Sequence, residues 1–307
     1  MDFKRKDLLG LEDLAEEEIL FILDTAKSFR EILNRPIKKI PALRGKTVVN
    51  LFFEASTRTR MSFELAEKRL NADVLNFSPS NSSIVKGESL QDTVKNILAM
   101  KVDCFVIRHS TPGVPYLLAK ELPVSIINAG DGAHEHPTQA LLDLYTIRET
   151  KGRIKDLKIL IVGDIAHSRV ARSDIWGLTR LKAKVRVCGP PALIPPMIEK
   201  MAVEVFFSLE EALREVDIVM MLRIQKERQN WGLFSSIGEY RDFFSLTEER
   251  LKLARKDILI MHPGPVNWGV ELPFKTSKSK KSIILNQVTN GIIVRMAILY
   301  LLLGRNR

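Results

Sequence analysis

The chain has 307 residues, of which 45% are hydrophobic and 27% are charged, and this balance excludes an intrinsically disordered protein. The length suits two domains of ordinary size, each with its own core. The formal net charge of +10 would suit nucleic acid or small anionic substrates, and scattered basic residues do not decide between these partners.

Short apolar runs alternate with amphipathic stretches from residue 47 onward, a pattern typical of βαβ units around a parallel sheet. The strands predicted in the first half are 47–53, 73–77, 104–109 and 124–128. Those predicted in the second half are 158–163, 184–188, 203–206, 217–222, 257–262 and 282–286. The expected fold class is therefore α/β, with two domains that each contain a parallel β-sheet flanked by helices.

The domain boundary is expected near Gly152, in the basic, polar run between the two predicted sheets. This gives a first domain at 1–150 and a second at 151–288. The C-terminal helix, 289–307, is apolar on nearly all sides, so we expect it to pack back on the first domain as a core helix.

A turn rich in hydroxyl and guanidinium groups follows the first predicted strand. It consists of Ser56, Thr57, Arg58, Thr59 and Arg60, and apolar residues at helical spacing come next. A helix N-terminus attracts anions, and these side chains add donors that match phosphate oxygens. In the alternative interpretation, Ser56 only caps the helix and the arginines are solvated. The unbroken succession of donors favours a site for a phosphorylated substrate.

Two further segments place polar side chains near strand or helix ends. Arg108 closes a predicted strand, and ligands of open α/β sheets bind beyond the carboxyl ends of strands, so Arg108 is expected to reach the same phosphate. His136 precedes Pro137 at the start of another predicted helix, where the helix dipole favours a neutral imidazole, although a capping role is the alternative. Lys86 lies in a serine-rich loop that by itself indicates only an exposed segment.

The second predicted sheet carries candidate groups for carboxylates. The turn after residue 163 lacks the glycines of a dinucleotide-binding motif, which disfavours such a cofactor. Arg169 and Arg223 each follow a predicted strand and would stand over one crevice, an arrangement that suits a ligand with carboxylates. Residues 262–265, His-Pro-Gly-Pro, form either a structural turn or a loop whose carbonyls face an amine.

The termini and the cysteines favour a cytoplasmic protein. The charged start is not a signal peptide, and the apolar stretch 292–303 is interrupted by Arg295 and is too short to cross a membrane. Cys104 and Cys188 lie in apolar runs and are expected to be buried free thiols rather than a disulfide, a metal site or a nucleophile.

Six motifs taken together resemble the aspartate carbamoyltransferase family, and they cover essentially the whole chain in family order. They are FFEASTRTRMSFE (52–64), KGESLQDT (86–93), IRH (107–109), HPTQALLDLY (136–145), MLRIQKER (221–228) and HPGP (262–265). The rival family, ornithine carbamoyltransferase, shares the phosphate turn but has a cysteine in the segment that here reads HPGP. A cationic acceptor would also call for an acidic partner in the second domain.

The resemblance implies a role for each matching residue. The phosphate of carbamoyl phosphate would be held by Ser56, Thr57, Arg58, Thr59 and Arg108, with Ser82 and Lys86 from a neighbouring subunit. Thr59, Arg108 and His136 would polarise the carbamoyl oxygen, and Gln139 would accompany the carbamoyl amine. Aspartate carboxylates would be bound by Lys86, Arg169, Arg223 and Gln225. The backbone of Gly264 and Pro265 would face the reacting amine, although Asn267 and Trp268 depart from the pattern.

The resemblance also implies a homotrimer with shared active sites and no metal or organic cofactor. It leaves open whether the trimer joins regulatory chains or dihydroorotase. Neither a nucleic acid nor a membrane is expected as a partner. We further expect Glu54, beside the phosphate turn, to pair with Arg169 in a closed form.

Overall fold

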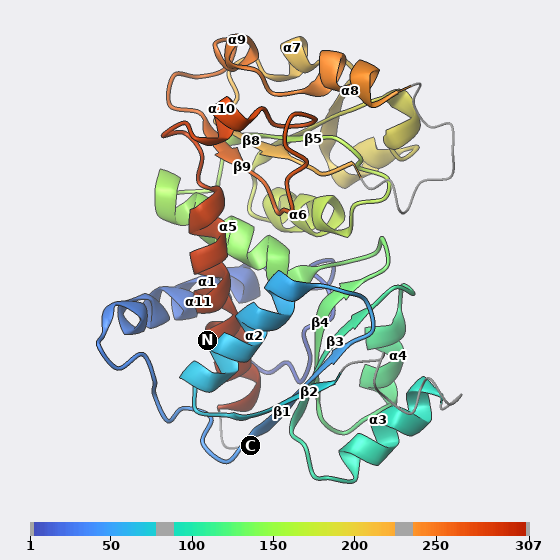
Figure 1. Cartoon of the computed structure of the whole chain (residues 1–307), viewed down its shortest axis with the longest axis vertical. Coiled ribbons are helices and arrows are strands. Elements are labelled where there is room, and N and C mark those ends of the chain that lie inside the picture. The colour runs from blue at the N-terminus through green and yellow to red at the C-terminus, as the bar shows by residue number, and fades with distance from the viewer. Residues whose placement is uncertain (1–2, 78–88, 225–235, 305–307) are drawn as a thin grey trace. The chain divides into compact units, whose positions relative to one another are not determined.

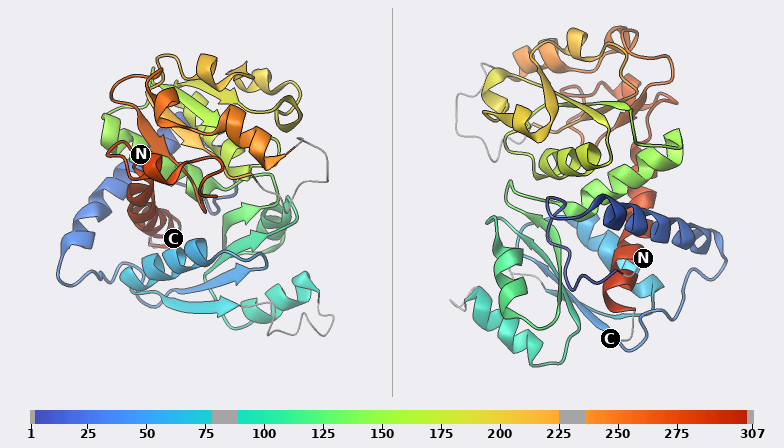
Figure 2. Two further views of the ribbon diagram at one scale, coloured as in Figure 1. Left: turned by 45° about the horizontal axis from the view of Figure 1, so that its top comes forward. Right: turned by 180° about the vertical axis from the view of Figure 1, so that it is seen from behind.

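The computed structural model describes residues 3–77, 89–224 and 236–304 of the chain. These residues form two compact units (Figures 1 and 2). The first comprises Met1–Tyr145 with Asn290–Arg307, and the second comprises Thr146–Thr289. The division falls inside two helices, α5 (Pro137–Lys151) and α11 (Ile284–Leu303), so each of these helices contributes residues to both units.

The first unit contains a four-stranded parallel sheet in the order β2-β1-β3-β4. Its strands are β1 (Thr47–Phe52), β2 (Asp73–Phe77), β3 (Cys104–His109) and β4 (Ser125–Asp131). Its other helices are α1 (Glu16–Asn34), α2 (Thr57–Arg69), α3 (Leu90–Leu98) and α4 (Val114–Glu121). α2 and α11 lie on one face of the sheet, and α3 and α4 lie on the other (Figures 1 and 2).

Burial along the strands follows their place in this sheet. β3 and β4 are buried along almost their whole length because helices cover both faces, which explains their continuous apolar runs. β2 is an edge strand and is largely exposed. The N-terminal segment lies along the opposite edge, where Leu8 N donates to Ile126 O at 2.9 Å and Asn128 N donates to Leu8 O at 2.9 Å.

The second unit contains a five-stranded parallel sheet in the order β7-β6-β5-β8-β9. Its strands are β5 (Lys158–Val162), β6 (Lys184–Cys188), β7 (Val203–Phe206), β8 (Ile218–Met221) and β9 (Leu259–Met261). Its helices are α6 (Arg169–Arg180), α7 (Leu209–Ala212), α8 (Ile237–Phe244), α9 (Glu248–Leu251) and α10 (Phe274–Ser277), with 3₁₀ turns at Pro191–Leu193 and Ile198–Met201.

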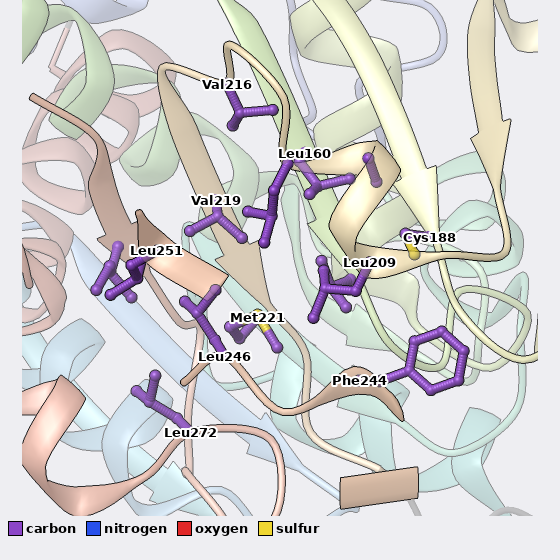
Figure 3. Packing of buried hydrophobic residues seen from close by; sticks show 14 of the residues in the cluster. Leu160, Cys188, Leu209, Val216, Val219, Met221, Phe244, Leu246, Leu251 and Leu272 are labelled. Atoms are coloured by element: carbon purple, nitrogen blue, oxygen red, sulfur yellow. The ribbon is translucent and has the colours of Figure 1, made fainter. Parts of the chain in front are cut away.

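The core of the second unit lies between one face of its sheet and the covering helices and loops. Figure 3 shows Leu160, Val219 and Met221 from neighbouring strands directed toward Leu209 and Leu246, and all five side chains are buried. This packing fixes the central strands β5 and β8, whose carboxyl ends carry two of the predicted site residues.

The strand predicted at 282–286 is wrong. Ser282 makes an isolated bridge with Ile260, and the chain then enters α11 at Ile284. A short apolar run fits a strand and a buried helix equally well, so its pattern could not distinguish the two.

The C-terminal helix α11 is largely buried, in keeping with its apolar composition. By length and composition it is the one helix in the described ranges that could cross a membrane, but 61% of its most apolar window is buried inside the protein. Arg295 in this helix is 3% exposed, donates to Ser62 Oγ at 2.9 Å and lies over the Phe63 ring. α11 is therefore packed as a core helix.

Both cysteines are free and buried, as predicted. Burial raises the pKa of the Cys104 thiol well above its ordinary value and raises that of Cys188 to about 12. A protonated thiol is a poor nucleophile, so neither cysteine has the electrostatic environment of a reactive one.

Candidate active site

The first part of the candidate site begins where β1 leaves its sheet. Ser56 is the N-cap of α2, and its carbonyl oxygen accepts from Arg60 N at 3.1 Å. In the described part of the chain its side chain makes no capping hydrogen bond, which argues against a purely capping role. The first turn of α2 carries no acidic residue, whereas the first turn of α1 carries three glutamates. The positive end of the α2 dipole is thus suited to an external anion.

The donors of this turn differ in their exposure. Thr57 and Arg58 are exposed, Ser56 and Arg60 are half-buried, and Thr59 is buried. An anion arriving from solvent can therefore reach the exposed donors, while Thr59 is mostly shielded from water. Hydrogen bonds to a charged group gain strength where water is excluded.

Arg108 connects three neighbouring segments of the first sheet. It is the next-to-last residue of β3 and pairs with Phe52 of β1, and its carbonyl oxygen accepts from Phe53 N at 2.9 Å. Its guanidinium donates from Nη1 to Ala129 O at 3.1 Å in β4 and from Nη2 to Glu54 Oε1 at 3.0 Å. The side chain is only 10% exposed. These contacts fix a largely desolvated cation next to the phosphate turn.

The ion pair of Arg108 with Glu54 was not expected from the sequence, in which the two residues lie 54 positions apart. An incoming phosphate would compete with the Glu54 carboxylate for this guanidinium. The expected pairing of Glu54 with Arg169 would join the two units and stays a prediction.

The turn from β4 to α5 brings His136 and Gln139 to the same edge of the first sheet. His136 is 4% exposed, and its carbonyl oxygen accepts from Gln139 N at 3.0 Å and from Ala140 N at 3.2 Å. The Gln139 amide donates to both carboxylate oxygens of Asp143, at 3.2 and 3.1 Å. Because β4 is the neighbour of β3, this turn adjoins the strand end that carries Arg108.

In the second unit, Arg169 and Arg223 lie at the carboxyl edge of the sheet. Arg169 is the first residue of α6, follows the N-cap Ser168 and is 4% exposed. Arg223 comes two residues after β8 and is half-buried. β5 and β8 are neighbours in the sheet, so the segments that follow them emerge side by side. The structure therefore places both arginines at the carboxyl edge of the second sheet, and their sharing of one crevice stays a prediction.

The His-Pro-Gly-Pro segment is fixed by a hydrogen-bond network that the sequence did not indicate. His262 Nδ1 accepts from Gly264 N at 2.7 Å, so the ring proton is assigned to Nε2, which faces Glu271 Oε1 at 3.2 Å. Glu271 Oε1 also accepts from Asn267 N at 2.6 Å. Gly264 has φ +65°, in the left-handed region that favours glycine. Pro265 follows it and is exposed.

Three predicted residues, Ser82, Lys86 and Gln225, lie outside the described residues. The described site thus consists of two sets of groups. The set in the first unit has the donors expected of a phosphate and carbonyl site, and the set in the second has two guanidinium groups suited to carboxylates. The sequence did not predict three of the contacts that hold these residues: Glu54 with Arg108, Asp143 with Gln139 and Glu271 with His262, although Glu54 and Asp143 lie inside the quoted motifs.

Two family models match the chain. The carbamoyl-P binding domain of aspartate/ornithine carbamoyltransferase matches residues 6–149, and the Asp/Orn binding domain of the same family matches residues 155–302. The chain is 57% identical to the aspartate carbamoyltransferase catalytic subunit of Halothermothrix orenii, over 99% of this chain and 97% of the relative. It is 58% identical to that of Syntrophus aciditrophicus, over 99% of both chains.

Solved structures of both branches of the family resemble the fold. Aspartate transcarbamoylase from Trypanosoma cruzi in complex with N-(phosphonacetyl)-L-aspartic acid aligns with a TM-score of 0.90 at 30% identity, covering 98% of this chain and 97% of that one. Ornithine carbamoyltransferase from Pyrococcus furiosus aligns with a TM-score of 0.89 at 30% identity, covering 100% of both chains. The fold alone therefore does not distinguish the two acceptor amino acids.

Proposed function

The chain belongs to the aspartate/ornithine carbamoyltransferase family, and we propose that it transfers the carbamoyl group of carbamoyl phosphate to the amine of L-aspartate. The products are N-carbamoyl-L-aspartate and phosphate, in the pyrimidine pathway that leads to UMP. The observation that carries the proposal is the position of Arg108, a buried cation fixed beside the donor-rich start of α2.

The first unit binds carbamoyl phosphate in this proposal. The turn formed by residues 56–59 holds the phosphate together with Arg108, and the helix dipole adds to the attraction. Thr59, Arg108 and His136 donate to the carbamoyl oxygen, and Gln139 accompanies the carbamoyl amine. The burial of Thr59, Arg108 and His136 supports these roles, because donors in a dry site stabilise a developing oxyanion more strongly than donors in water.

The second unit binds L-aspartate. Arg169 and Arg223 pair with its carboxylates, and Gln225 assists them. The loop that contains Gly264 and Pro265 presents its backbone carbonyls to the amine. Two arginines at one sheet edge suit a dicarboxylate better than a cationic acceptor such as ornithine, and relatives at 57–58% identity bear the aspartate name.

The chemistry is a direct acyl transfer. The neutral aspartate amine attacks the carbamoyl carbon, the carbonyl oxygen becomes an oxyanion, and the bond to the phosphate oxygen then breaks. As the phosphate departs with the bonding electron pair, it accepts the surplus proton that the attacking amine gives up, so the products are the neutral carbamoyl amide and hydrogen phosphate. The contribution of the protein is to orient the two substrates and to stabilise the charge on the oxyanion and on the leaving group.

The functional assembly in this proposal is a cytoplasmic homotrimer. Each protomer lends Ser82 and Lys86 to the site of its neighbour, and Lys86 also contacts aspartate. One chain offers the phosphate dianion the positive charges of Arg58 and Arg108. The Lys86 ammonium of the neighbouring protomer would add another positive charge.

A colourimetric assay for carbamoyl-aspartate tests the proposed reaction. We expect purified protein to form the product in proportion to enzyme and time, with phosphate released in equal amount. Phosphate binding without turnover would instead indicate an anion sensor. Retention on nucleic acid with no product would indicate that the +10 net charge serves a polyanion.

A further inference from the structure

Glu135, the residue before His136, has a buried side chain that contacts the N-terminal segment. It is 0% exposed. Its carboxylate accepts from Leu11 N at 3.1 Å on each oxygen and from Glu12 N at 3.1 Å. A buried carboxylate is stable when backbone N–H groups surround it, so this contact anchors residues 11–12 to the turn that carries His136.

The main chain of Glu135 is fixed as firmly as its side chain. Glu135 N donates to Asp131 Oδ1 at 3.1 Å, and Asp131 N donates to Glu135 O at 3.1 Å. Asp131 Oδ1 also accepts from Asn128 Nδ2 at 2.8 Å, and its Oδ2 accepts from Gly113 N at 2.8 Å. The peptide that leads into His136 is thus held on one side by Asp131 and on the other by the N-terminal segment.

Gly10 shows how closely the N-terminal segment approaches this turn. A Cβ at Gly10 would lie 2.8 Å from Glu135 Oε1 and 2.9 Å from the Tyr116 hydroxyl, which is closer than real Cβ contacts. The segment itself is anchored to β4, since Ile126 N donates to Asp7 Oδ1 at 2.8 Å and Asn128 Nδ2 donates to Leu9 O at 2.8 Å. The Glu135 carboxylate therefore has no free space in which to shift without moving the N-terminal segment.

We propose that Glu135 is a positioning residue for the transfer reaction: by tying the N-terminal segment to the β4–α5 turn, it holds His136 where the imidazole meets the carbamoyl oxygen. The inference rests on the proposed function. It assigns residues 7–12 to the support of the active site, although they contribute no group to the reaction. The phosphate turn on α2 is anchored separately, so the loss of Glu135 should disturb the oxyanion contact and spare phosphate binding.

The test compares Glu135→Ala, Glu135→Gln and Gly10→Ala with the wild type in the carbamoyl-aspartate assay, with calorimetric titration of inorganic phosphate. We expect Glu135→Ala to lower kcat at least tenfold and to leave the Kd of phosphate within twofold. Glu135→Gln, which keeps an acceptor oxygen, should recover most of kcat. Gly10→Ala should lower kcat severalfold in the wild type but cause no further loss when combined with Glu135→Ala.

Leu118→Ala is the matched control. It removes a buried side chain from a core cluster of the same unit that contains no residue of α5. It should lower Tm and leave kcat unchanged. The proposal is overturned if Glu135→Ala keeps wild-type kcat, or if it reduces kcat and phosphate affinity in the same proportion. Should Glu135→Ala fail to fold, wild-type kcat in Gly10→Ala would overturn it. Absence of carbamoyl-aspartate formation by the wild type would instead refute the proposed function.

Discussion

At the scale of single residues, Arg108 shows how one side chain can serve both the fold and the chemistry. Its guanidinium donates to Ala129 O and to Glu54 Oε1, and these contacts hold the charged group inside the protein. When substrate binds, we expect phosphate and the carbamoyl oxygen to take over part of this guanidinium. Before substrate binds, the Glu54 carboxylate would take the place of the substrate anion and hold the Arg108 guanidinium in its orientation.

The substitution Arg108→Ala should lower kcat by about a hundredfold to a thousandfold, because it removes a donor to the developing oxyanion. Steady-state kinetics with carbamoyl phosphate and aspartate check this. The control is Arg186→Ala, which removes a mostly buried arginine of the second sheet that binds Glu204 and backbone carbonyls. Arg186→Ala should reduce stability and leave kcat near that of the wild type. An Arg108→Ala enzyme with wild-type turnover would rule out the assigned role.

At this scale, the sequence predicts the features that depend on residues adjacent in the chain. The succession of donors at 56–60 and the arginine at a strand end follow from neighbours in the chain, so their places at one sheet edge could be expected. The partners Glu54, Ala129 O and Glu271 come from distant segments. Glu54 lies in the motif 52–64, but nothing local indicates that it pairs with Arg108, and a single glutamate or carbonyl such as Glu271 or Ala129 O is compatible with many partners.

At the scale of elements, α2 is tied to the sheet by a buried carboxyl group. Glu67 is 0% exposed and accepts from Asn50 Nδ2 of β1 at 2.9 Å, and Asn50 Nδ2 also donates to Asn76 Oδ1 of β2 at 3.1 Å. Burial raises the pKa of Glu67 to about 8. The carboxyl group is therefore protonated at neutral pH, and its neutral form joins α2 to two strands through Asn50.

This carboxyl group predicts a pH-dependent stability. The folded chain retains a proton that the unfolded chain releases above the ordinary glutamate pKa of 4.5, so Glu67 makes unfolding easier as the pH rises from 4.5 to about 8. Relative to Glu67→Gln, the free energy of unfolding of the wild type should fall across this window by about 5 kcal/mol and then level off. Urea denaturation of both proteins at several pH values measures the difference. A difference that does not vary with pH would contradict the assignment.

The His-Pro-Gly-Pro loop gives a second prediction at this scale. Glu271 Oε1 fixes both His262 and Asn267, so Glu271→Ala should loosen the backbone expected to face the aspartate amine. We expect kcat/KM for aspartate to fall about tenfold, because a misplaced reacting group loses rate steeply. Phosphate affinity should be unchanged, since the phosphate turn belongs to the first unit. A proportional loss of phosphate affinity would mean that Glu271 supports more than this loop.

Strand positions were predictable where apolar runs are short and clearly bounded, as in β2 and β6, whose observed limits equal the predicted ones. The segment 282–286 was not, because its first residues bridge to Ile260 while the rest enters α11. Periodicity cannot separate a short strand from the buried start of a helix.

At the scale of the whole molecule, the proposed active site takes residues from more than one chain. Lys86 and Ser82, which lie outside the described residues, are assigned to a neighbour's site. The family resemblance supplied this expectation, and the composition and charge pattern of a single chain carry no signal for it.

Mixing inactive variants tests the sharing of sites. Lys86→Ala and Arg108→Ala proteins should each be inactive alone. After joint unfolding and refolding, about one site in four should combine an intact Lys86 with an intact Arg108 from adjacent protomers. Partial recovery of carbamoyl-aspartate formation, in a species with three times the mass of the chain, would support shared sites. Mixtures that stay inactive while such a species forms would contradict them.

The most direct test of the central claim is a competition between acceptors. The enzyme is incubated with carbonyl-labelled [¹³C]carbamoyl phosphate and equal concentrations of L-aspartate and L-ornithine, and the labelled products are followed by ¹³C NMR against an enzyme-free control. The account predicts that label accumulates in carbamoyl-aspartate, with a preference over carbamoyl-ornithine of at least about a hundredfold. Label in carbamoyl-ornithine, or no enzyme-dependent product at all, would contradict it.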